Sequence, residues 1–202
     1  QWPSDEYPHR VPFLVNEVDA IRKCGVDVDV FAFSGRGRPL NYLRDWLKLQ
    51  HFLQEHTYDL IHAQFGQSGL ITIFPKPTPH IVKFHGSDLN GIYTPSVNLT
   101  TRGYILRRAS QVVASIADAV ILVSASLAQF LPRKQKNYHV LPCGLDMDLF
   151  RPMSRQDAKE HLGLDKDKRY VLFSGGRTNP IKRFSLAKAS ISHLPTYLNA
   201  EL

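Results

Sequence analysis

Short apolar runs alternate with amphipathic stretches along most of this chain, and this alternation restricts the possible folds more than any other feature. Residues 79–84 and 119–123 have the apolar character of buried strands, and residues 101–115 between them have helical spacing. The same patterns predict strands at 26–33, 58–63 and 138–141 and helices at 12–24, 41–56, 69–74 and 127–131. Apolar strands separated by helices are typical of a parallel sheet covered on both faces. We therefore predict a doubly wound α/β fold, which binds ligands at the carboxyl ends of its strands.

The pattern changes after Pro142, where a turn-rich segment leads away from the predicted sheet. Ser154 is expected to cap a helix over 154–162 that Gly163 ends. A strand at 170–174, a loop at 175–182 and a helix at 185–193 follow. This order predicts one domain over residues 1–148, a crossover linker and helix over 149–168, and the first β-α unit of a second domain over 169–202.

Charge narrows the choice of partner. Lysine and arginine number 25 against 18 acidic residues, so the formal net charge is +7 and an anionic partner is favoured. The cations are dispersed, they lack the aromatic interleaving found in proteins that bind single-stranded nucleic acid, and no nucleic-acid-binding signature is present, which argues against nucleic acid. An anionic membrane surface or a phosphate-bearing small molecule therefore remains, and the leading alternative is that the dispersed cations are ordinary solvated surface charges.

The sequence also indicates a compartment. No apolar run approaches the ~20 residues that span a bilayer, and residues 1–6 lack the basic start and apolar stretch of a secretory signal. Cys24 and Cys143 have neither metal-binding nor redox spacing. We therefore expect a cytoplasmic location, with possible peripheral contact at the inner face of the membrane.

The first candidate site is the sequence Phe84-His85-Gly86-Ser87-Asp88, directly after the predicted strand at 79–84. Gly86 would let the backbone approach a ligand, and His85 can donate or accept a hydrogen bond near neutral pH. Asp88 could accept from a ligand hydroxyl or orient the imidazole. The alternative is a polar turn in which Asp88 caps the next segment.

The second candidate site combines Gly175, Gly176 and Arg177 with Lys182, between a predicted strand and a predicted helix. Exposed glycine amides, a helix start and two cations could hold a diphosphate. The spacing matches neither the P-loop nor the Gly-x-Gly-x-x-Gly pattern. A glycine-rich turn with two solvated cations is the alternative.

Other patterns are weaker. Taken alone, the segment from Pro142 through Gly144 to Asp146 is a turn, and Ser124 is by default a helix N-cap. The nine histidines include no i,i+4 pair with a glutamate between and no His-x-His sequence, so we predict no metal site. No Gly-x-Ser-x-Gly sequence is present, which argues against a hydrolase triad.

These patterns, in this order, resemble the family 4 glycosyltransferases, which have the GT-B architecture of two Rossmann-like, doubly wound domains. The resemblance covers nearly the whole chain, including the segment from Tyr7 to Val30 and the segment from Tyr58 to Ala63. Its most specific parts are the four stretches His85 to Asp88, Val120 to Ser124, Pro142 through Asp146 to Pro152, and Gly176-Arg177 with Lys182.

The resemblance implies a role for each candidate residue. His85 would lie over the donor sugar, and Arg177 and Lys182 would hold the nucleotide diphosphate and stabilise the leaving phosphate. Further substrate-binding positions would be Gly86, Asp88, Ser124, Gly144, Asp146, Gly175 and Gly176. Neither a metal nor another cofactor is implied, because the cations and the helix start would balance the diphosphate charge.

The implied reaction is the transfer of a hexose from a nucleotide-diphosphate sugar to a hydroxyl of a glycan or lipid-linked acceptor, with retained configuration. A non-catalytic sugar- or nucleotide-binding α/β module is the alternative. Cys143 stands where the family usually has Asn, and the interval from Arg177 to Lys182 is about one residue short. We expect the first strand to precede Gln1, and most of the second domain, with its pair of glutamates, to follow Leu202. The chain alone is accordingly expected to be inactive.

Overall fold

The computed structural model describes residues 2–3, 11–33, 35, 39–74, 78–94, 96, 98–177 and 182–201. The chain divides into two compact units. Unit 1 comprises residues 1–92 and 99–146, and unit 2 comprises residues 93–98 and 147–202. Each unit is described by itself.

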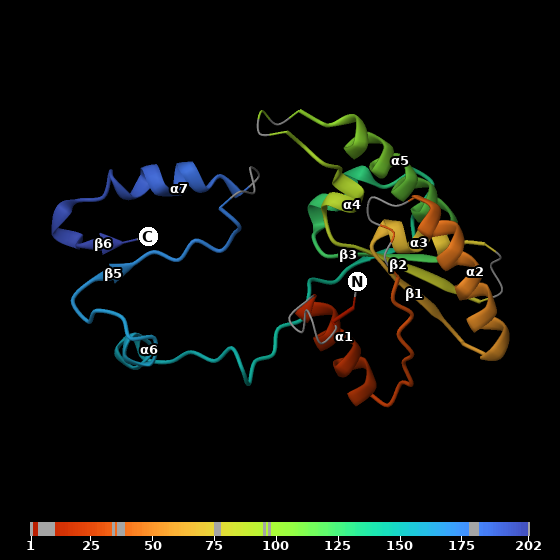
Figure 1. Ribbon diagram of the computed structural model, residues 1–202, viewed down its shortest axis with the longest axis horizontal. Helices are drawn as coiled ribbons and strands as arrows, with labels where there is room; N and C mark the ends of the chain where they lie inside the picture. The colour runs from red at the N-terminus through yellow and green to blue at the C-terminus, as the bar shows by residue number, and fades with distance from the viewer. Residues whose placement is uncertain are drawn as a thin grey trace. The chain divides into compact units, whose positions relative to one another are not determined.

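Unit 1 is built on a parallel sheet, as Figure 1 shows. Its described strands are β1 (Ile61–Gln64), β2 (His80–Phe84), β3 (Ala119–Leu122) and β4 (Tyr138–Val140), hydrogen-bonded in that order. The register pairs Ala63 with Val82 and Val82 with Val120, so the carboxyl ends lie at one edge. The predicted parallel α/β sheet is confirmed.

One face of the sheet carries the apolar core, under α3 (Gly66–Thr72), α4 (Ser87–Asn90), α5 (Thr101–Ile116) and the 3-10 helix η1 (Ala125–Phe130). Alternate residues of β2 and β3 point into this core because successive strand side chains face opposite ways. The fully buried apolar members from these strands and from α5 are Val82, Phe84, Val113, Ala114, Val120 and Leu122. Burial of a large apolar side chain contributes roughly 1.5–3 kcal/mol, so this cluster holds the unit together.

The opposite face of the sheet meets α1 (Pro12–Lys23). Lys83 lies between Val82 and Phe84 in β2 and therefore points away from the core, where its ammonium pairs with Glu17 of α1 at 2.9 Å. The predicted helix start at Pro12 is confirmed, and Gly25 follows the helix with a φ of +82°. Elements on both faces thus shield β1, β2 and β3 from solvent, whereas the residues of β4 are exposed.

The helix α2 (Pro39–Glu55) packs beside α3. The indole nitrogen of Trp46 donates a 2.6 Å hydrogen bond to the carbonyl of Phe74, just after α3. The predicted helix at 41–56 is therefore confirmed, with its start moved to Pro39. The predicted helix at 69–74 begins earlier, at Gly66.

The predicted strand at 26–33 is wrong. Residues 26–33 are described and form no strand, because a strand requires a hydrogen-bonded neighbour and the described strands pair with one another. Val26 is 52% exposed, which shows that the apolar alternation here is not buried in the described sheet. β-Branched residues favour an extended backbone, but only tertiary pairing turns that backbone into a strand.

Unit 2 contains α6 (Arg155–His161), β5 (Arg169–Tyr170), α7 (Phe184–Ile191), the 3-10 helix η3 (Thr196–Leu198) and β6 (Ala200–Glu201). Ser154 caps α6, since its hydroxyl accepts from the N–H of Asp157 at 3.1 Å, and Gly163 follows with a φ of +64°. Both predictions for this helix are confirmed.

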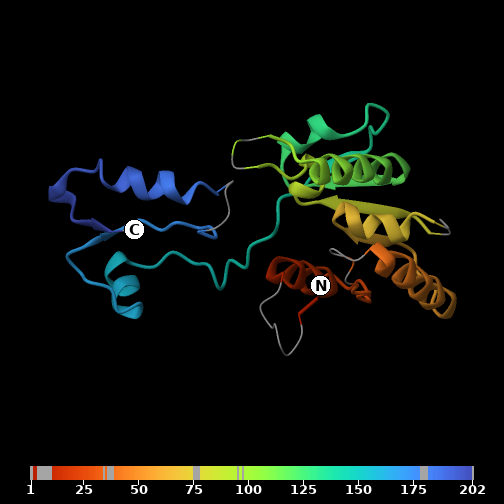
Figure 2. The ribbon, with the colours of Figure 1, turned by 45° about the horizontal axis from the view of Figure 1, so that its top comes forward.

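The strand predicted at 170–174 is mostly wrong. The described ladder of β5 includes only Arg169 and Tyr170, which pair in parallel with Ala200 and Glu201 of β6. One more hydrogen bond follows, from the N–H of Val171 to the carbonyl of Glu201. Among the described residues, the segment beyond that point has no strand partner, and it runs beside α7 in Figure 1 and Figure 2.

Glycine allows α3 to approach α5 closely. A Cβ on Gly69 would overlap the side chain of Val113, and one on Gly66 would overlap Ser110. Val113 and Ser110 are themselves buried, so neither can move aside easily. The close contact between these helices therefore requires glycine, which has no side chain, at positions 66 and 69.

We predict that Gly69→Ala lowers the free energy of unfolding by about 1–3 kcal/mol, because the added methyl overpacks the helix contact. Urea unfolding followed by circular dichroism measures the change. Gly144→Ala is the matched control, since a Cβ there would meet nothing within 4 Å, and should stay within about 0.5 kcal/mol. Equal losses in both variants would contradict the packing argument.

Candidate functional site

The backbone turns sharply at the carboxyl end of β2 and brings His85 to the edge of the sheet. β2 ends at Phe84, and Gly86 has a φ of +131° before α4 begins at Ser87. A residue with a side chain would be strained at this φ, although the space around Gly86 is open. The predicted position of His85 and Gly86 at the carboxyl edge is therefore confirmed.

The side chain of Asp88 is buried and binds the backbone of this turn. It is 2% exposed, and its carboxylate accepts hydrogen bonds from the N–H groups of Gly86 at 2.8 Å, His85 at 3.1 Å and Gly66 at 3.2 Å. Burial raises the pKa of Asp88, while these N–H groups act in the opposite direction. The expectation that Asp88 orients the imidazole is corrected, because its carboxylate oxygens accept from backbone N–H groups of the turn after β2 and of the first residue of α3.

The imidazole of His85 is held by β1 instead. Its Nε2 lies 2.8 Å from Oε1 of Gln64, the last residue of β1. Its ring packs against Phe65, with 4.3 Å between centroids, and against Phe13 of α1 at 5.1 Å. Phe65 has a φ of +71°, an uncommon conformation for a bulky residue, so the chain accepts backbone strain beside this ring.

His85 is a neutral group in this setting. Burial, followed by the positive charge of Lys83, lowers the pKa of His85 to about 4, against an opposing effect of Glu17. At neutral pH the imidazole can therefore donate one hydrogen bond and accept another without carrying charge.

Sequence reasoning missed the polar network behind His85. Glu17 accepts from Lys83 at 2.9 Å and from Nε2 of Gln64 at 3.3 Å, and that amide nitrogen lies 3.4 Å from Nε2 of His62. The available signal was Lys83 itself, a lysine inside an apolar strand, since buried lysines are rare unless they are paired. The partner Glu17 could not be found from spacing, because it is 66 residues away.

The segment after β4 reaches the same edge. The sulfur of Cys143 lies 4.0 Å from Nδ1 of His85, which links the first and third predicted patterns. Gly144 and Asp146 are exposed beyond it. Ser124 also follows a strand end, but its hydroxyl lies 2.9 Å from the hydroxyl of Ser126 and does not cap η1, which corrects the N-cap expectation.

The remaining predicted residues lie in unit 2. Lys182 is exposed and its aliphatic chain runs against Gly175, where an added Cβ would lie 3.0 Å from Cγ of the lysine. The guanidinium of Arg177 stacks 5.3 Å from the ring of Phe184, the first residue of α7. Gly176, which lies between Gly175 and Arg177 in the sequence, is exposed. Residues 178–181 of the predicted loop lie outside the described residues.

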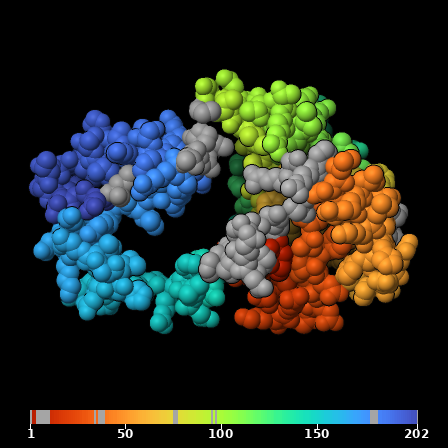
Figure 3. Space-filling view, viewed as in Figure 1, coloured from red at the N-terminus to blue at the C-terminus, as the bar shows by residue number. Residues whose placement is uncertain are grey.

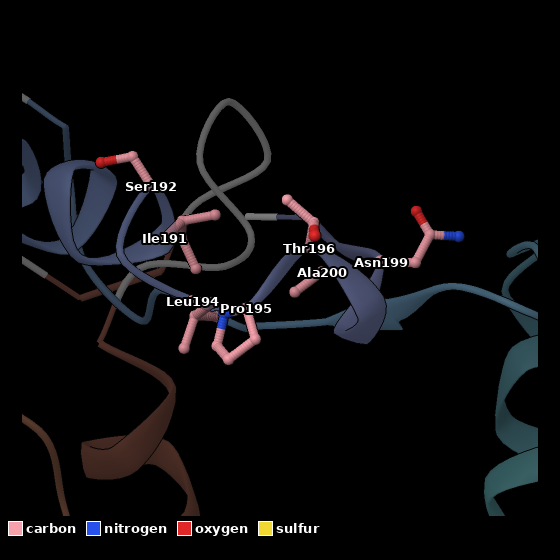
Figure 4. Close-up of a pocket in the computed structure, with 7 residues that line it drawn as sticks. All are labelled: Ile191, Ser192, Leu194, Pro195, Thr196, Asn199 and Ala200. Carbon is pink, nitrogen blue, oxygen red and sulfur yellow. The ribbon is translucent and has the colours of Figure 1, made fainter.

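A hollow of about 300 Å³ also lies in unit 2, near the end of α7 (Figure 4). It is lined by Ile191, Ser192, Leu194, Pro195, Thr196, Asn199 and Ala200. None of these lining residues is charged, so the hollow does not supply the cations that a diphosphate requires. Among the described residues, no cluster of histidine, cysteine and carboxylate side chains could hold a metal ion.

Two bacterial enzymes are similar to this chain in sequence. The D-inositol 3-phosphate glycosyltransferase of Xylanimonas cellulosilytica is 27% identical over 74% of this chain and 39% of its own length. D-inositol 3-phosphate glycosyltransferase 1 of Catenulispora acidiphila is 23% identical over 81% of this chain and 47% of its own length. The chain therefore spans less than half the length of each relative.

The fold also has a solved counterpart. Sucrose-phosphate synthase from Thermosynechococcus elongatus superposes with a TM-score of 0.65 over 83% of this chain and 43% of its own, at 19% identity. This likeness shows a GT-B, Rossmann-like fold. The sequence model of Glycosyltransferase Family 4 matches residues 5–149, which is most of the chain and includes His85, Gly86 and Asp88. The chain therefore belongs to glycosyltransferase family 4.

Proposed function

We propose that this chain is part of a retaining glycosyltransferase that moves a hexose from a nucleotide-diphosphate sugar to a hydroxyl of a glycan or lipid-linked acceptor. The observation that carries the proposal is the neutral imidazole of His85, held at the carboxyl edge of a parallel sheet. Ligands of open α/β sheets bind at this edge. Membership of glycosyltransferase family 4 supports glycosyl transfer as the reaction.

In the proposed reaction, the bond between the anomeric carbon and the phosphate oxygen breaks, and its electron pair leaves with the diphosphate. The acceptor hydroxyl forms the new bond on the same face of the sugar, and its proton passes to the departing phosphate oxygen. The imidazole of His85 accepts a hydrogen bond from a hydroxyl of the donor sugar. Gly86 keeps the backbone open beside it, because no side chain projects there.

Lys182 and Arg177 are the proposed cations for the diphosphate. Both are exposed, and contacts with Gly175 and with the ring of Phe184 limit their freedom. Fixed cations aimed at developing negative charge lower the barrier without reorganisation at the moment of reaction. We therefore propose a metal-independent reaction, with Gly175, Gly176, Ser124, Gly144 and Asp146 among the substrate-binding positions.

We predict that Lys182→Ala in the whole protein cuts turnover by roughly 10²-fold, which corresponds to ~3 kcal/mol of transition-state stabilisation. Folding should be nearly unchanged because the side chain is exposed. Release of the nucleotide diphosphate, measured with a panel of nucleotide sugars, reports the rate. The control is Arg133→Ala, an exposed cation outside the proposed site.

The opposite result, with Lys182→Ala active and Arg133→Ala impaired, would place the diphosphate elsewhere. A non-catalytic binding module would release no nucleotide above the hydrolytic background in any variant. Wild-type turnover of the whole protein therefore separates transfer from simple binding.

We also propose that the parent enzyme lies on the cytoplasmic face of an anionic membrane and meets a lipid-linked acceptor there. No described helix is both long enough and apolar enough to cross a bilayer. The surface of α2, in orange in Figure 3, instead combines exposed Leu40, Leu43 and Leu47 with the exposed cation Lys48 and with Arg44, whose guanidinium also pairs with Asp45 at 2.8 Å. Apolar groups beside cations suit an interfacial helix on anionic lipid.

We predict that the protein co-sediments with vesicles containing phosphatidylserine and that binding weakens as salt rises, because the attraction is screened. The double variant Leu43→Gln, Leu47→Gln should reduce binding several-fold, since it removes apolar area from the interface. Arg133→Gln, which changes charge outside α2, is the control. Equal partition onto neutral and anionic vesicles, with no effect of salt, would contradict the proposal.

A further inference from the structure

The side-chain amide of Gln64 has a fixed orientation. Its nitrogen lies 3.3 Å from a carboxylate oxygen of Glu17 and 3.4 Å from Nε2 of His62, and its oxygen lies 2.8 Å from Nε2 of His85. A flipped amide would turn its oxygen toward the carboxylate of Glu17, placing two acceptors together. The amide nitrogen thus has the carboxylate of Glu17 as an acceptor only in the orientation observed.

Glu17 is itself held in place. Its other carboxylate oxygen accepts from the ammonium of Lys83 at 2.9 Å, and the side chain of Lys83 is only 5% exposed. Glu17 belongs to α1, Gln64 to β1 and Lys83 to β2. The chain of contacts from Lys83 through Glu17 and Gln64 to His85 therefore joins three elements and ends at the candidate site.

We infer that Gln64, oriented by Glu17, is a positioning residue that holds His85 in a single neutral tautomer. The oxygen of Gln64 can only accept, so Nε2 of His85 must carry the hydrogen. In the neutral ring Nδ1 then has the free lone pair and serves as an acceptor. That nitrogen is the one beside Cys143, at the carboxyl edge of the sheet.

Burial, more than the charges around it, keeps the ring of His85 neutral near pH 7. The titratable groups that face it are Glu17 from α1, His62 from β1, Lys83 from β2 and Cys143 from the segment after β4. Lys83 and His62 disfavour the imidazolium and Glu17 favours it, while burial is the largest effect and also disfavours it. The net result is a pKa of about 4 for His85, so the ring stays neutral well below pH 7.

This inference rests on the proposed function only for its catalytic consequence. With Nδ1 as a fixed acceptor, His85 selects a donor sugar that presents a hydroxyl, and it cannot donate from Nδ1 unless it is protonated. Gln64 would then affect turnover through His85, without contacting the substrate.

Nitrogen NMR of the protein labelled with ¹⁵N-histidine tests the tautomer directly. The expected result for the wild type is a protonated Nε2 and an unprotonated Nδ1 on His85, assigned by comparison with His85→Asn. Gln64→Leu should give mixed tautomers, because the acceptor is lost. Gln64→Glu keeps an acceptor, so it should retain the tautomer and raise the pKa of His85 by roughly one pH unit or more through the new negative charge.

Turnover provides a second readout on the same variants. Gln64→Leu should lower kcat/KM roughly tenfold, the effect of about one hydrogen bond, and Gln64→Glu should move the acid limb of the pH profile upward. The exposed Gln54→Leu is the matched control and should change neither readout. A protonated Nδ1 in the wild type, or unchanged signals in Gln64→Leu, would overturn the inference. Failure of the proposed function can be distinguished from failure of this inference. In that case the whole protein would show no turnover, while the tautomer of His85 would still change in Gln64→Leu.

Discussion

The carboxylate of Asp88 is the contact on which the carboxyl edge of the sheet depends. It accepts hydrogen bonds from N–H groups of the loop after β2 and of the start of α3. It therefore joins the segments that follow the neighbouring strands β1 and β2. A buried N–H without an acceptor costs about 1–3 kcal/mol, and the single side chain of Asp88 avoids this cost for the N–H groups that it accepts from. These hydrogen bonds tie the turn that contains His85 and the positive φ of Gly86 to the start of α3.

The second constraint is the pair of Lys83 and Glu17 on the opposite face of β2. A buried ion pair contributes little net stability, but loss of one partner leaves an unpaired charge that costs about 3–5 kcal/mol. The pair therefore adds little stability itself, but it disfavours any position of α1 that would separate Glu17 from the buried ammonium of Lys83. Since Glu17 also binds Gln64, the same pair extends its influence to the imidazole of His85.

Different contacts hold unit 2 together. Its described strands share a ladder of only two residue pairs, and Phe173 packs on Phe184 at 5.2 Å between centroids. Arg177 stacks on the same Phe184 ring. The aromatic pair thus joins the extended segment after β5 to the start of α7, and the cations of the proposed diphosphate site lie close to this joint.

Local chemistry in the sequence determined much of this protein. Apolar periodicity predicted β2, β3, β4 and α5, because buried strands and amphipathic helices have distinct spacings, and Ser154 predicted the start of α6. The same periodicity wrongly predicted a strand at 26–33, since pairing depends on a neighbour that the pattern does not contain. Only the tertiary structure decided that Asp88 binds backbone amides and that Gln64 holds His85. Of these contacts, Asp88 with the amide of Gly66 and Gln64 with His85 join residues 22 and 21 positions apart, and spacing along a chain carries no information about which distant groups will meet.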